Sequence, residues 1–365
     1  MPDMHQIALI RNLPSTTSPL APSHFYGLGR EALVQAFRDA GEQAYRADQL
    51  MTWIYRRHVT DFDQMTDLPA GLRARLSTIA NFELPPIESL LSSPDGDTNK
   101  FVLRLRDGEL VECVSMRTER RLTMCLSSQV GCALKCSFCA TGLMGLRRNL
   151  DASEIVAQVM VMGAQSGWKD DRFNLVFMGM GEPLVNYDPV VQSIRILREP
   201  RGLNLGSRRI TVSTSGVVPQ IKRLAQEGMA LGLALSLHAT TDAVRDELVP
   251  INKRWPIAEV LETAREYGRT TGRRVTLEYT LIAGVNDSLE DAARLAEFAR
   301  SLPSKINLIP YNPVPGLKWQ RPSPESVEAF AQSLYPRAPA VTVRNTMGGE
   351  IWAACGQLGG LSSGR

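Results

Sequence analysis

The sequence predicts an α/β fold built on an incomplete (βα)6 barrel of the TIM type, with a small N-terminal helical accessory domain and a β-hairpin extension. From residue 122 onward, short apolar runs alternate with helical periods, as in parallel β/α units. Helical periodicity alone covers residues 30–79, and strand alternation around an Asp107-Gly108 turn covers residues 100–116. A chain of 365 residues is long enough for a barrel-sized domain and a small accessory one.

Composition describes an ordinary globular protein. Apolar residues make up 44% of the chain and charged residues 22%. No uncharged run approaches the ~20 apolar residues of a membrane span, and the N-terminus lacks the features of a signal peptide. The 41 Lys and Arg barely exceed the 38 Asp and Glu, so any nucleic-acid contact must come from local clusters. Six unevenly placed cysteines do not fit a secreted disulfide scaffold. We therefore expect a cytoplasmic protein without a membrane partner. We also expect a monomer, which the composition does not by itself indicate.

The first 95 residues divide into two parts. Residues 1–25 are rich in Pro, Ser and Thr and predict a poorly ordered leader. Residues 26–95 contain three amphipathic stretches and predict the helical accessory domain. Its residues that suit RNA contact are Arg46, Arg56, Arg57 and His58, beside the aromatic residues Trp53 and Tyr55. Solvated charge over core aromatics explains the same pattern equally well, so both interpretations stay open.

Residues 96–350 are expected to hold the hairpin and the partial barrel, and residues 351–365 a C-terminal segment. The expected strands are 122–126, 174–178, 209–213, 232–237, 275–281 and 306–310. The expected helices lie near 152–164, 188–199, 217–227, 256–268, 288–301 and 324–335. Six units are too few for a closed barrel of eight. In such barrels the chemistry gathers at the carboxyl ends of the strands.

Three cysteines, Cys132, Cys136 and Cys139, stand close together in the sequence GCALKCSFCATG. An iron–sulfur cubane is usually held by four thiolates, so a local set of three leaves one iron open. An open position on a metal generally indicates chemistry. The alternatives are a zinc knuckle and buried structural cysteines. A zinc knuckle needs a fourth Cys or His nearby, and none lies between Cys139 and His238.

With Phe138 before the third cysteine, this spacing resembles the signature of radical S-adenosylmethionine (SAM) enzymes. The flanking words are similar to those of the RlmN/Cfr-type RNA adenine methyltransferases, and most like the RlmN branch: CLSSQVGC, LRRNL, GMGEPL, STSG, SLHA, VPINK, NLIPYNP and AACGQL. The resemblance runs from about Gln43 to Leu358. It implies a radical SAM barrel, one [4Fe-4S] cluster on the three cysteines and two SAM molecules per turnover.

The resemblance also implies the SAM contacts, at the ends of successive predicted strands. They are Gly181 and Glu182, with Glu182 taking the amino group of SAM, then Ser213, the run Ser236, Leu237 and His238, and Asn312. Taken singly, a Ser or Asn at a strand end is more often a satisfied turn residue. Because several such residues follow neighbouring predicted strands, a shared binding site is favoured. The pattern gives His238 no acid or base role.

The resemblance also implies roles in the reaction for three further residues. Cys355 would carry a methyl group during turnover, and Cys125 would later form a transient disulfide with it. Glu112, thirteen residues before Cys125, would be the general base. Without the resemblance, the sequence would predict that Cys355 is an inert packed thiol and that Glu112 is a solvated carboxylate on a strand. Glycines on both sides of Cys355 indicate a segment that can swing.

The implied reaction is methylation of adenine carbon 2 in large-subunit ribosomal RNA, and the resemblance leaves transfer RNA open as a second substrate. Carbon 2 is electron-poor, so it cannot attack the methyl of SAM directly. Methylation of carbon 8, of the Cfr type, is the alternative, because the HATTD run at 238–242 and Trp352 depart from the usual pattern. A non-catalytic iron–sulfur RNA-binding protein and a radical SAM activase are the competing classes. The expected partners are RNA and an electron-donating reductase.

Overall fold

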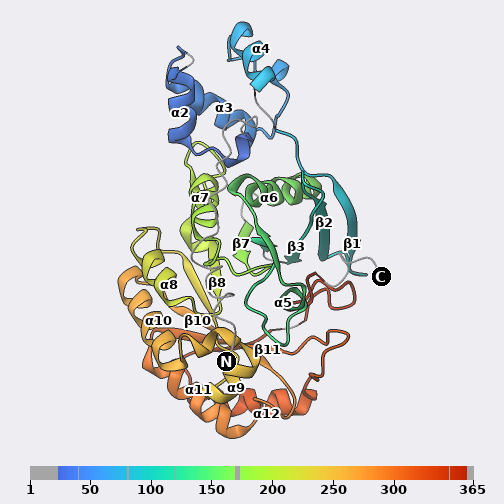
Figure 1. Ribbon diagram of the computed structural model, residues 1–365, viewed down its shortest axis with the longest axis vertical. Coiled ribbons are helices and arrows are strands. Elements are labelled where there is room, and N and C mark those ends of the chain that lie inside the picture. Colours follow the sequence, from blue (N-terminus) through green and yellow to red (C-terminus); the bar gives the residue numbers. More distant parts are fainter. Residues whose placement is uncertain are drawn as a thin grey trace.

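The computed structural model describes residues 24–39, 41–79, 82–119, 121–168, 173–344 and 346–359 (Figure 1). Most of the predicted leader, residues 1–23, lies outside these ranges. The helices are α2 Arg30–Asp39, α3 Tyr45–Tyr55, α4 Ala70–Ile79, α5 Ala140–Met144, α6 Ala152–Ser166, α7 Tyr187–Arg198, α8 Val218–Ala225, α9 Asp242–Leu248, α10 Ile257–Thr271, α11 Leu289–Ser301 and α12 Pro324–Leu334. The strands are β1 Ile87–Ser92, β2 Thr98–Arg104, β3 Leu110–Thr118, β4 Arg121–Cys125, β5 Gln129–Gly131, β6 Leu146–Asn149, β7 Phe173–Phe177, β8 Ile210–Thr214, β9 Gly232–Ser236, β10 Val275–Leu281, β11 Ser304–Pro310 and β12 Val341–Val343.

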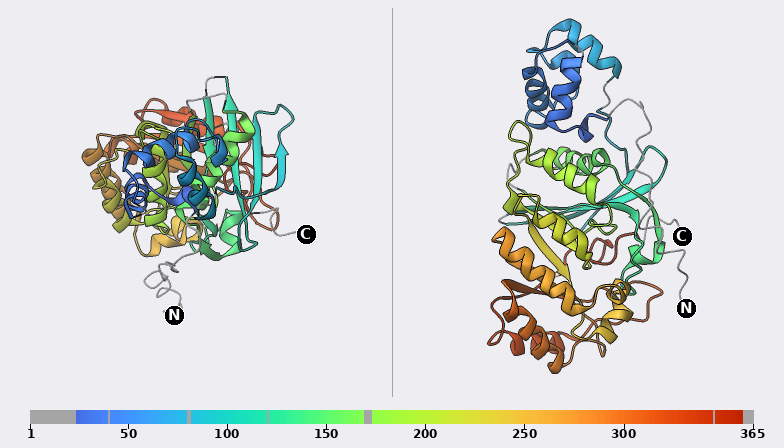
Figure 2. Two further views of the ribbon diagram at one scale, coloured as in Figure 1. Left: turned by 90° about the horizontal axis from the view of Figure 1, so that it is seen from above. Right: turned by 60° about the vertical axis from the view of Figure 1, so that its left-hand side comes forward.

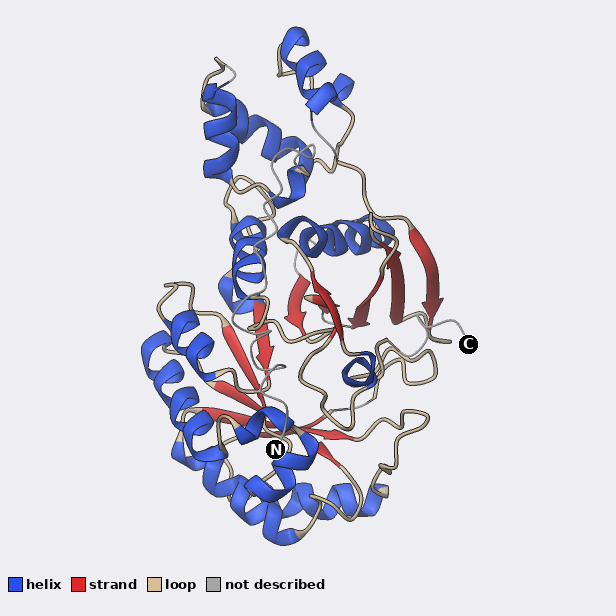
Figure 3. Ribbon diagram, in the orientation of Figure 1, coloured by secondary structure: helices blue, strands red, loops and turns tan. Residues whose placement is uncertain are grey.

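One sheet organises the fold. Its order is β1-β2-β3-β4-β7-β8-β9-β10-β11-β12, and all neighbours from β4 onward are parallel. Figure 3 shows the strands as an arc, with α8, α10, α11 and α12 on its outer side. Within the described residues β12 does not pair with β1 or β4, so the arc stays open. The predicted α/β class, the incomplete barrel and its six parallel strands in chain order are confirmed.

The hairpin extension is larger than predicted. β2 and β3 pair antiparallel with Thr98 opposite Met116, and Gly108 turns the chain with φ +84°. β1 pairs antiparallel with β2, which makes the extension a three-stranded unit joined to the barrel through β3 and β4. The range 26–95 expected for the helical domain therefore includes a strand of the sheet. Sequence reasoning missed β1 because its side chains alternate only weakly in polarity and are mostly exposed.

The helical accessory domain packs on α6 and α7 through the short turn at Phe25–Gly27 (Figure 2). Trp53 is 8% exposed and Tyr55 1%, so both belong to its core. The interpretation of these two rings as a platform for stacked bases is therefore wrong. Arg56 donates to the carbonyl oxygens of Pro200 and Gly202, beyond the end of α7. This residue ties the accessory domain to the barrel.

Sequence reasoning also missed several short elements: α5, α9, β12 and the two-stranded sheet of β5 and β6. Each is three to seven residues long, too short to show a periodic pattern. Within the described part of the chain, no helix has the length and apolar character needed to cross a bilayer.

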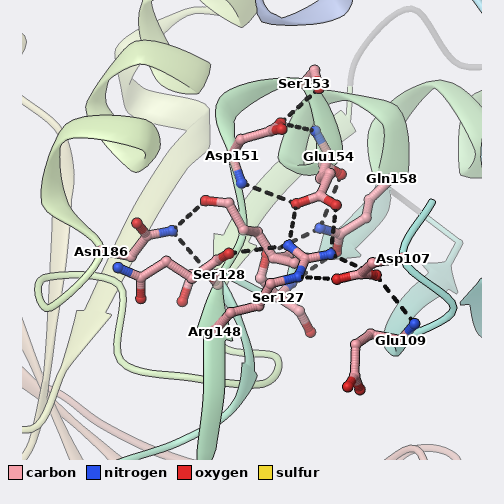
Figure 4. Close-up of polar contacts among 12 residues, drawn as sticks. Asp107, Glu109, Ser127, Ser128, Arg148, Asp151, Ser153, Glu154, Gln158 and Asn186 are labelled. Carbon is pink, nitrogen blue, oxygen red and sulfur yellow. Dashed lines mark hydrogen bonds and ion pairs between the residues drawn. The ribbon is translucent and has the colours of Figure 1, made fainter. Parts of the chain in front are cut away.

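Arg148 of β6 joins the hairpin to the barrel (Figure 4). Its Nε and Nη2 donate to both carboxylate oxygens of Asp107 at 2.5 and 3.0 Å, and its Nη1 and Nη2 donate to Glu154 at 2.8 Å. Glu154 also forms a capping box with Asp151 at the start of α6. The Arg148 hydrogen bonds hold the pKa of the Asp107 carboxyl below its usual value. One side chain thus fixes the hairpin turn against the first barrel helix.

We expect Arg148→Met to lower the free energy of unfolding by about 1 kcal/mol at neutral pH, because it removes charge-assisted bonds to two carboxylates. Since the folded pKa of Asp107 is lowered, its contribution is present above the ordinary aspartate pKa of about 3.9 and is lost as the pH falls. The difference between variant and wild type should shrink in urea titrations at low pH. The neighbouring, more exposed Arg147 pairs with Glu109, and Arg147→Met should change little. An equal loss in both variants would contradict this account.

Candidate functional site

A cavity of about 150 Å³ opens at the carboxyl ends of the parallel strands. This is where the fold class predicts chemistry. The expected site residues that line it are Cys132, Cys136, Cys139, Gly181, Glu182, Ser213, Ser236, His238 and Cys355. Segments from residue 132 to residue 356 therefore meet at one place.

Backbone hydrogen bonds to segments later in the sequence shape the cysteine loop. Cys132 N donates to Gly145 O at 3.0 Å, and Ser137 N donates to Leu248 O at 3.0 Å. Gly131 has φ +76°, and a Cβ there would lie 1.8 Å from the Gly145 oxygen. Only glycine allows β5 and β6 to approach this closely. The loop that presents the thiols is thus held by β5, β6 and the end of α9.

The three thiols suit an iron–sulfur cluster better than a single ion. Among the described residues, no group of three or more His, Cys, Asp or Glu lies close enough to hold one metal ion. Nevertheless, Cys132, Cys136 and Cys139 line one cavity, and thiolates are the ligands of iron–sulfur clusters. In a cluster each sulfur binds a different iron, so the sulfurs need not converge on one point. Burial raises the pKa of Cys132 to about 12, so metal binding must release its proton.

Glu182 connects two strand ends beside the cysteines. Its side chain is buried, with Oε2 accepting from Ser215 N at 2.8 Å and Oε1 from Leu184 N at 3.1 Å. Burial raises the pKa of its carboxyl, partly offset by these bonds. Gly181 has φ +97°, and a Cβ there would lie 2.5 Å from the Gln129 Cβ. The loop after β7 therefore brings a fixed carboxylate into the cavity.

We expect Glu182→Gln to weaken SAM binding by about tenfold or more, because a charge-assisted hydrogen bond to the amino group would be lost. Equilibrium dialysis with anaerobically reconstituted protein measures the dissociation constant. Glu88→Gln removes a carboxylate on the exposed strand β1 and serves as the control. Unchanged SAM affinity in Glu182→Gln would contradict the expectation that Glu182 contacts SAM.

The expected contacts after β8 and β9 are only partly brought together. The hydroxyl oxygens of Ser213 and Ser236 lie 3.4 Å apart on the cavity wall. His238 accepts from Thr280 N through Nδ1 at 3.0 Å, and burial, with the nearby Arg245 charge, lowers its pKa to about 3. At neutral pH the His238 imidazole is therefore uncharged, and its Nδ1 is engaged by the Thr280 amide. Leu237 is fully buried and does not line the cavity, and its backbone N donates to Glu278 O at 3.0 Å, so the structure does not bring this residue into the site.

Arg245 is a structural residue of the site that sequence reasoning missed. Its fully buried guanidinium donates to the carbonyl oxygens of Ser215, Ser236 and Leu237 at 2.7, 3.2 and 2.9 Å. It also donates to Asn252 of the VPINK word at 2.8 Å. These bonds fix the backbone after β8 and β9. An arginine on a short helix gives no sequence signal that separates this role from solvated charge.

Cys355 lies where two cavities meet. It lines the cavity of the three cysteines and also a second, smaller cavity lined by Cys125, Asn312 and Arg344. Asn312 donates to Cys355 O at 3.1 Å, while its Oδ1 accepts from Arg321 at 3.1 Å. Asn312 therefore stands on the Cys125 side and holds the Cys355 backbone. Burial, together with the nearby Cys355, raises the pKa of Cys125 to about 12.

Arg344, immediately after β12, lines both cavities and was not expected from the sequence. Its pKa is raised, first by the neighbouring Cys355 and also by Glu278 and Cys125. Arg344 thus places a positive charge between the two cavities, beside Cys125 and Cys355. Because β12 has only three residues, the sequence did not predict this strand, and Arg344 was not recognised as a residue at a strand end.

Glu112 lies on β3 behind the cavity rather than in its lining. Its side chain is fully buried, not solvated as an isolated strand carboxylate would be. Lys100 Nζ lies 3.3 Å from its Oε2, which also accepts from Gly359 N at 3.0 Å. Glu112 is thus engaged with the segment that carries Cys355.

Comparisons with known proteins agree with this geometry. The Radical SAM superfamily profile matches residues 126–296, and the profile of the ribosomal RNA large subunit methyltransferase N-terminal domain matches residues 24–82. A probable dual-specificity RNA methyltransferase RlmN of Symbiobacterium thermophilum is 47% identical over 333 residues, 91% of this chain and 90% of that protein. The chain belongs to the RlmN family. A dual-specificity RNA methyltransferase RlmN of Anaeromyxobacter sp. is also 47% identical, over 90% of this chain and 87% of that one.

Solved structures support the same assignment. The crystal structure of a radical SAM methyltransferase from Sphaerobacter thermophilus matches with a TM-score of 0.87 and 47% identity, over 92% of this chain and 99% of that chain. This RlmN-family protein is therefore a SAM-dependent radical RNA methyltransferase, and the family implies a [4Fe-4S] cluster and SAM. The resemblance found in the sequence is confirmed. The non-catalytic RNA-binding module and the activase are excluded.

Proposed function

We propose that this RlmN-family protein methylates carbon 2 of an adenine in large-subunit ribosomal RNA through an S-methylcysteine at Cys355, and that transfer RNA is a second substrate. The position of Cys355 carries the proposal. It lines the cavity of the three cysteines and the cavity of Cys125, so one thiol adjoins both groups that the reaction needs. The profile of the N-terminal domain supports the ribosomal substrate, and the dual-specificity name of the relatives supports a second RNA.

Cys355 would first accept the methyl group of one SAM by displacement, with its thiolate as the nucleophile. Arg344 lies beside this thiol and would stabilise the charged form. Cys132, Cys136 and Cys139 would hold the cluster, leaving one iron for the amino and carboxylate groups of a second SAM. When bound, the cluster supplies the reductive chemistry that removes a hydrogen atom from an unreactive methyl group.

The remaining steps fall to residues around the second cavity. The carbon radical attached to Cys355 would bond to carbon 2 of the adenine. To restore the aromatic ring, one electron would then return to the iron–sulfur centre and the proton at carbon 2 would pass to Glu112. The Cys125 thiolate would then attack the Cys355 sulfur. The S–S bond forms as the S–C bond breaks, the carbon leaves with the electron pair and takes up a proton, and methylated RNA departs. An electron-donating reductase would reduce the disulfide before the next turnover.

The target adenine must leave its stack before its ring can enter a cavity of this kind, so we propose a single-stranded or loop target.

The test is mass spectrometry of Cys355 together with analysis of the modified nucleosides. We expect a methyl group on Cys355 after incubation with SAM, and 2-methyladenosine in ribosomal and transfer RNA treated with the complete system. The isomer 8-methyladenosine would replace the proposal by the Cfr-type alternative. An unmodified Cys355 under conditions of turnover would contradict the S-methylcysteine route.

A further inference from the structure

A buried ion pair lies beneath the segment that carries Cys355. Lys100 of β2 and Glu112 of β3 are diagonal neighbours, with Nζ and Oε2 3.3 Å apart and both side chains 0% exposed. Removing two charges from water is costly, and a pair of apolar residues often gives equal stability at such a place. Burial lowers the pKa of Lys100, and the Glu112 charge opposes that shift. Hairpin stability alone therefore does not account for the pair.

Each member of the pair also binds one end of the same loop. Lys100 Nζ donates to Trp352 O at 3.3 Å, three residues before Cys355. Gly359 N donates to Glu112 Oε2 at 3.0 Å, four residues after Cys355. Trp352 and Gly359 have φ +58° and +94°, so the backbone at these two points is in the left-handed region. Charge-assisted hydrogen bonds are stronger than neutral ones, which suits a site that holds such a backbone.

Other residues of the loop accept hydrogen bonds from segments outside the hairpin. Ala140 N donates to Gly356 O at 2.8 Å, Thr141 Oγ1 donates to Leu358 O at 2.6 Å, and Asn312 donates to Cys355 O. Residues 352–359 form no helix or strand. Their position depends on such contacts, and the two at the ends come from one ion pair.

We infer that the Lys100–Glu112 pair is a latch that holds the Cys355 loop at both of its ends, which makes Lys100 a positioning residue for Cys355. The inference rests on the proposed function of Cys355 and Glu112. In the closed latch, Glu112 Oε2 accepts from Lys100 and from Gly359. Movement of the loop breaks the bond from Gly359, so the proposed base loses one of these two donors when the Cys355 segment moves. Protonation of Glu112 removes the charge that holds the latch and keeps it open while Cys125 attacks.

Hydrogen exchange measured by mass spectrometry on the anaerobically reconstituted full chain tests the latch. Lys100→Met should speed exchange of amides in residues 352–359 by about tenfold, as expected for the loss of a charge-assisted bond. Amides of β2 and β3 should keep their wild-type rates. Arg104→Met, on the same strand but at an exposed ion pair, should leave the loop unchanged. Faster exchange throughout β2 and β3, or an unchanged loop, would overturn the latch.

A second variant covers the case in which Lys100→Met leaves an unpaired buried carboxylate and does not fold. Lys100→Met/Glu112→Gln removes both charges and keeps an acceptor for Gly359, so folding should be retained. The bond to Trp352 is still lost, and Cys355 should react with iodoacetamide about tenfold faster than in wild type. A wild-type alkylation rate would overturn the latch. Neither readout needs turnover. A loosened loop in the variants, with a wild-type protein that does not methylate RNA, would refute the proposed function alone. An unchanged loop in the variants, with an active wild-type enzyme, would refute the latch alone.

Discussion

Cys355→Ala should abolish formation of methylated adenine, a loss of more than about 10³-fold, as is typical when a nucleophile is removed. The physical reason is that carbon 2 of adenine is electron-poor and cannot take the methyl group from SAM by direct displacement. Without the thiol, no carbon is delivered to the cavity. Liquid chromatography and mass spectrometry of nucleosides from treated RNA measure the loss.

Two controls separate this effect from damage to the fold. The iron content of Cys355→Ala should match wild type, because the three cluster cysteines lie on a different segment and are unchanged. Cys113→Ala removes a fully buried thiol on β3 that lines neither cavity, and it should retain most of the activity. Product formation by Cys355→Ala above about one hundredth of the wild-type rate would mean that the methyl group travels by another route.

The barrel could be predicted because its physical signals are local. Most of the parallel strands are short buried runs, such as Val275–Leu281, followed by a longer amphipathic helix, so the two periods alternate clearly. The accessory helices carry the same signal. By contrast, β1 is mostly exposed, and β12 has only three residues, so neither has a periodicity of its own. Their place in the sheet comes from pairing with neighbours distant in sequence.

The candidate site was predicted unevenly for a related reason. Cys132, Cys136 and Cys139 stand in one loop, and their spacing alone limits the chemistry. Arg344 and Lys100 could not be predicted as site residues, because their roles depend on neighbours that are distant in sequence and close only in the fold. A lysine in an alternating strand is ordinarily a solvated residue, and nothing in its neighbourhood shows that it pairs with a carboxylate twelve positions later. Such residues become visible only when burial and hydrogen bonds are known.

Cys125→Ala should leave the enzyme covalently bound to its RNA. The carbon bonded to Cys355 would still join the adenine ring, but no second thiol would break the S–C bond. Protein and RNA should remain covalently linked and migrate together on a denaturing gel, with released methylated RNA reduced more than about 10³-fold. The double variant Cys125→Ala/Cys355→Ala should form no adduct, because the attachment point is gone. Free methylated RNA from Cys125→Ala at the wild-type rate would show that resolution does not need Cys125. The placement of Cys125 and Cys355 around one small cavity makes the adduct the expected result.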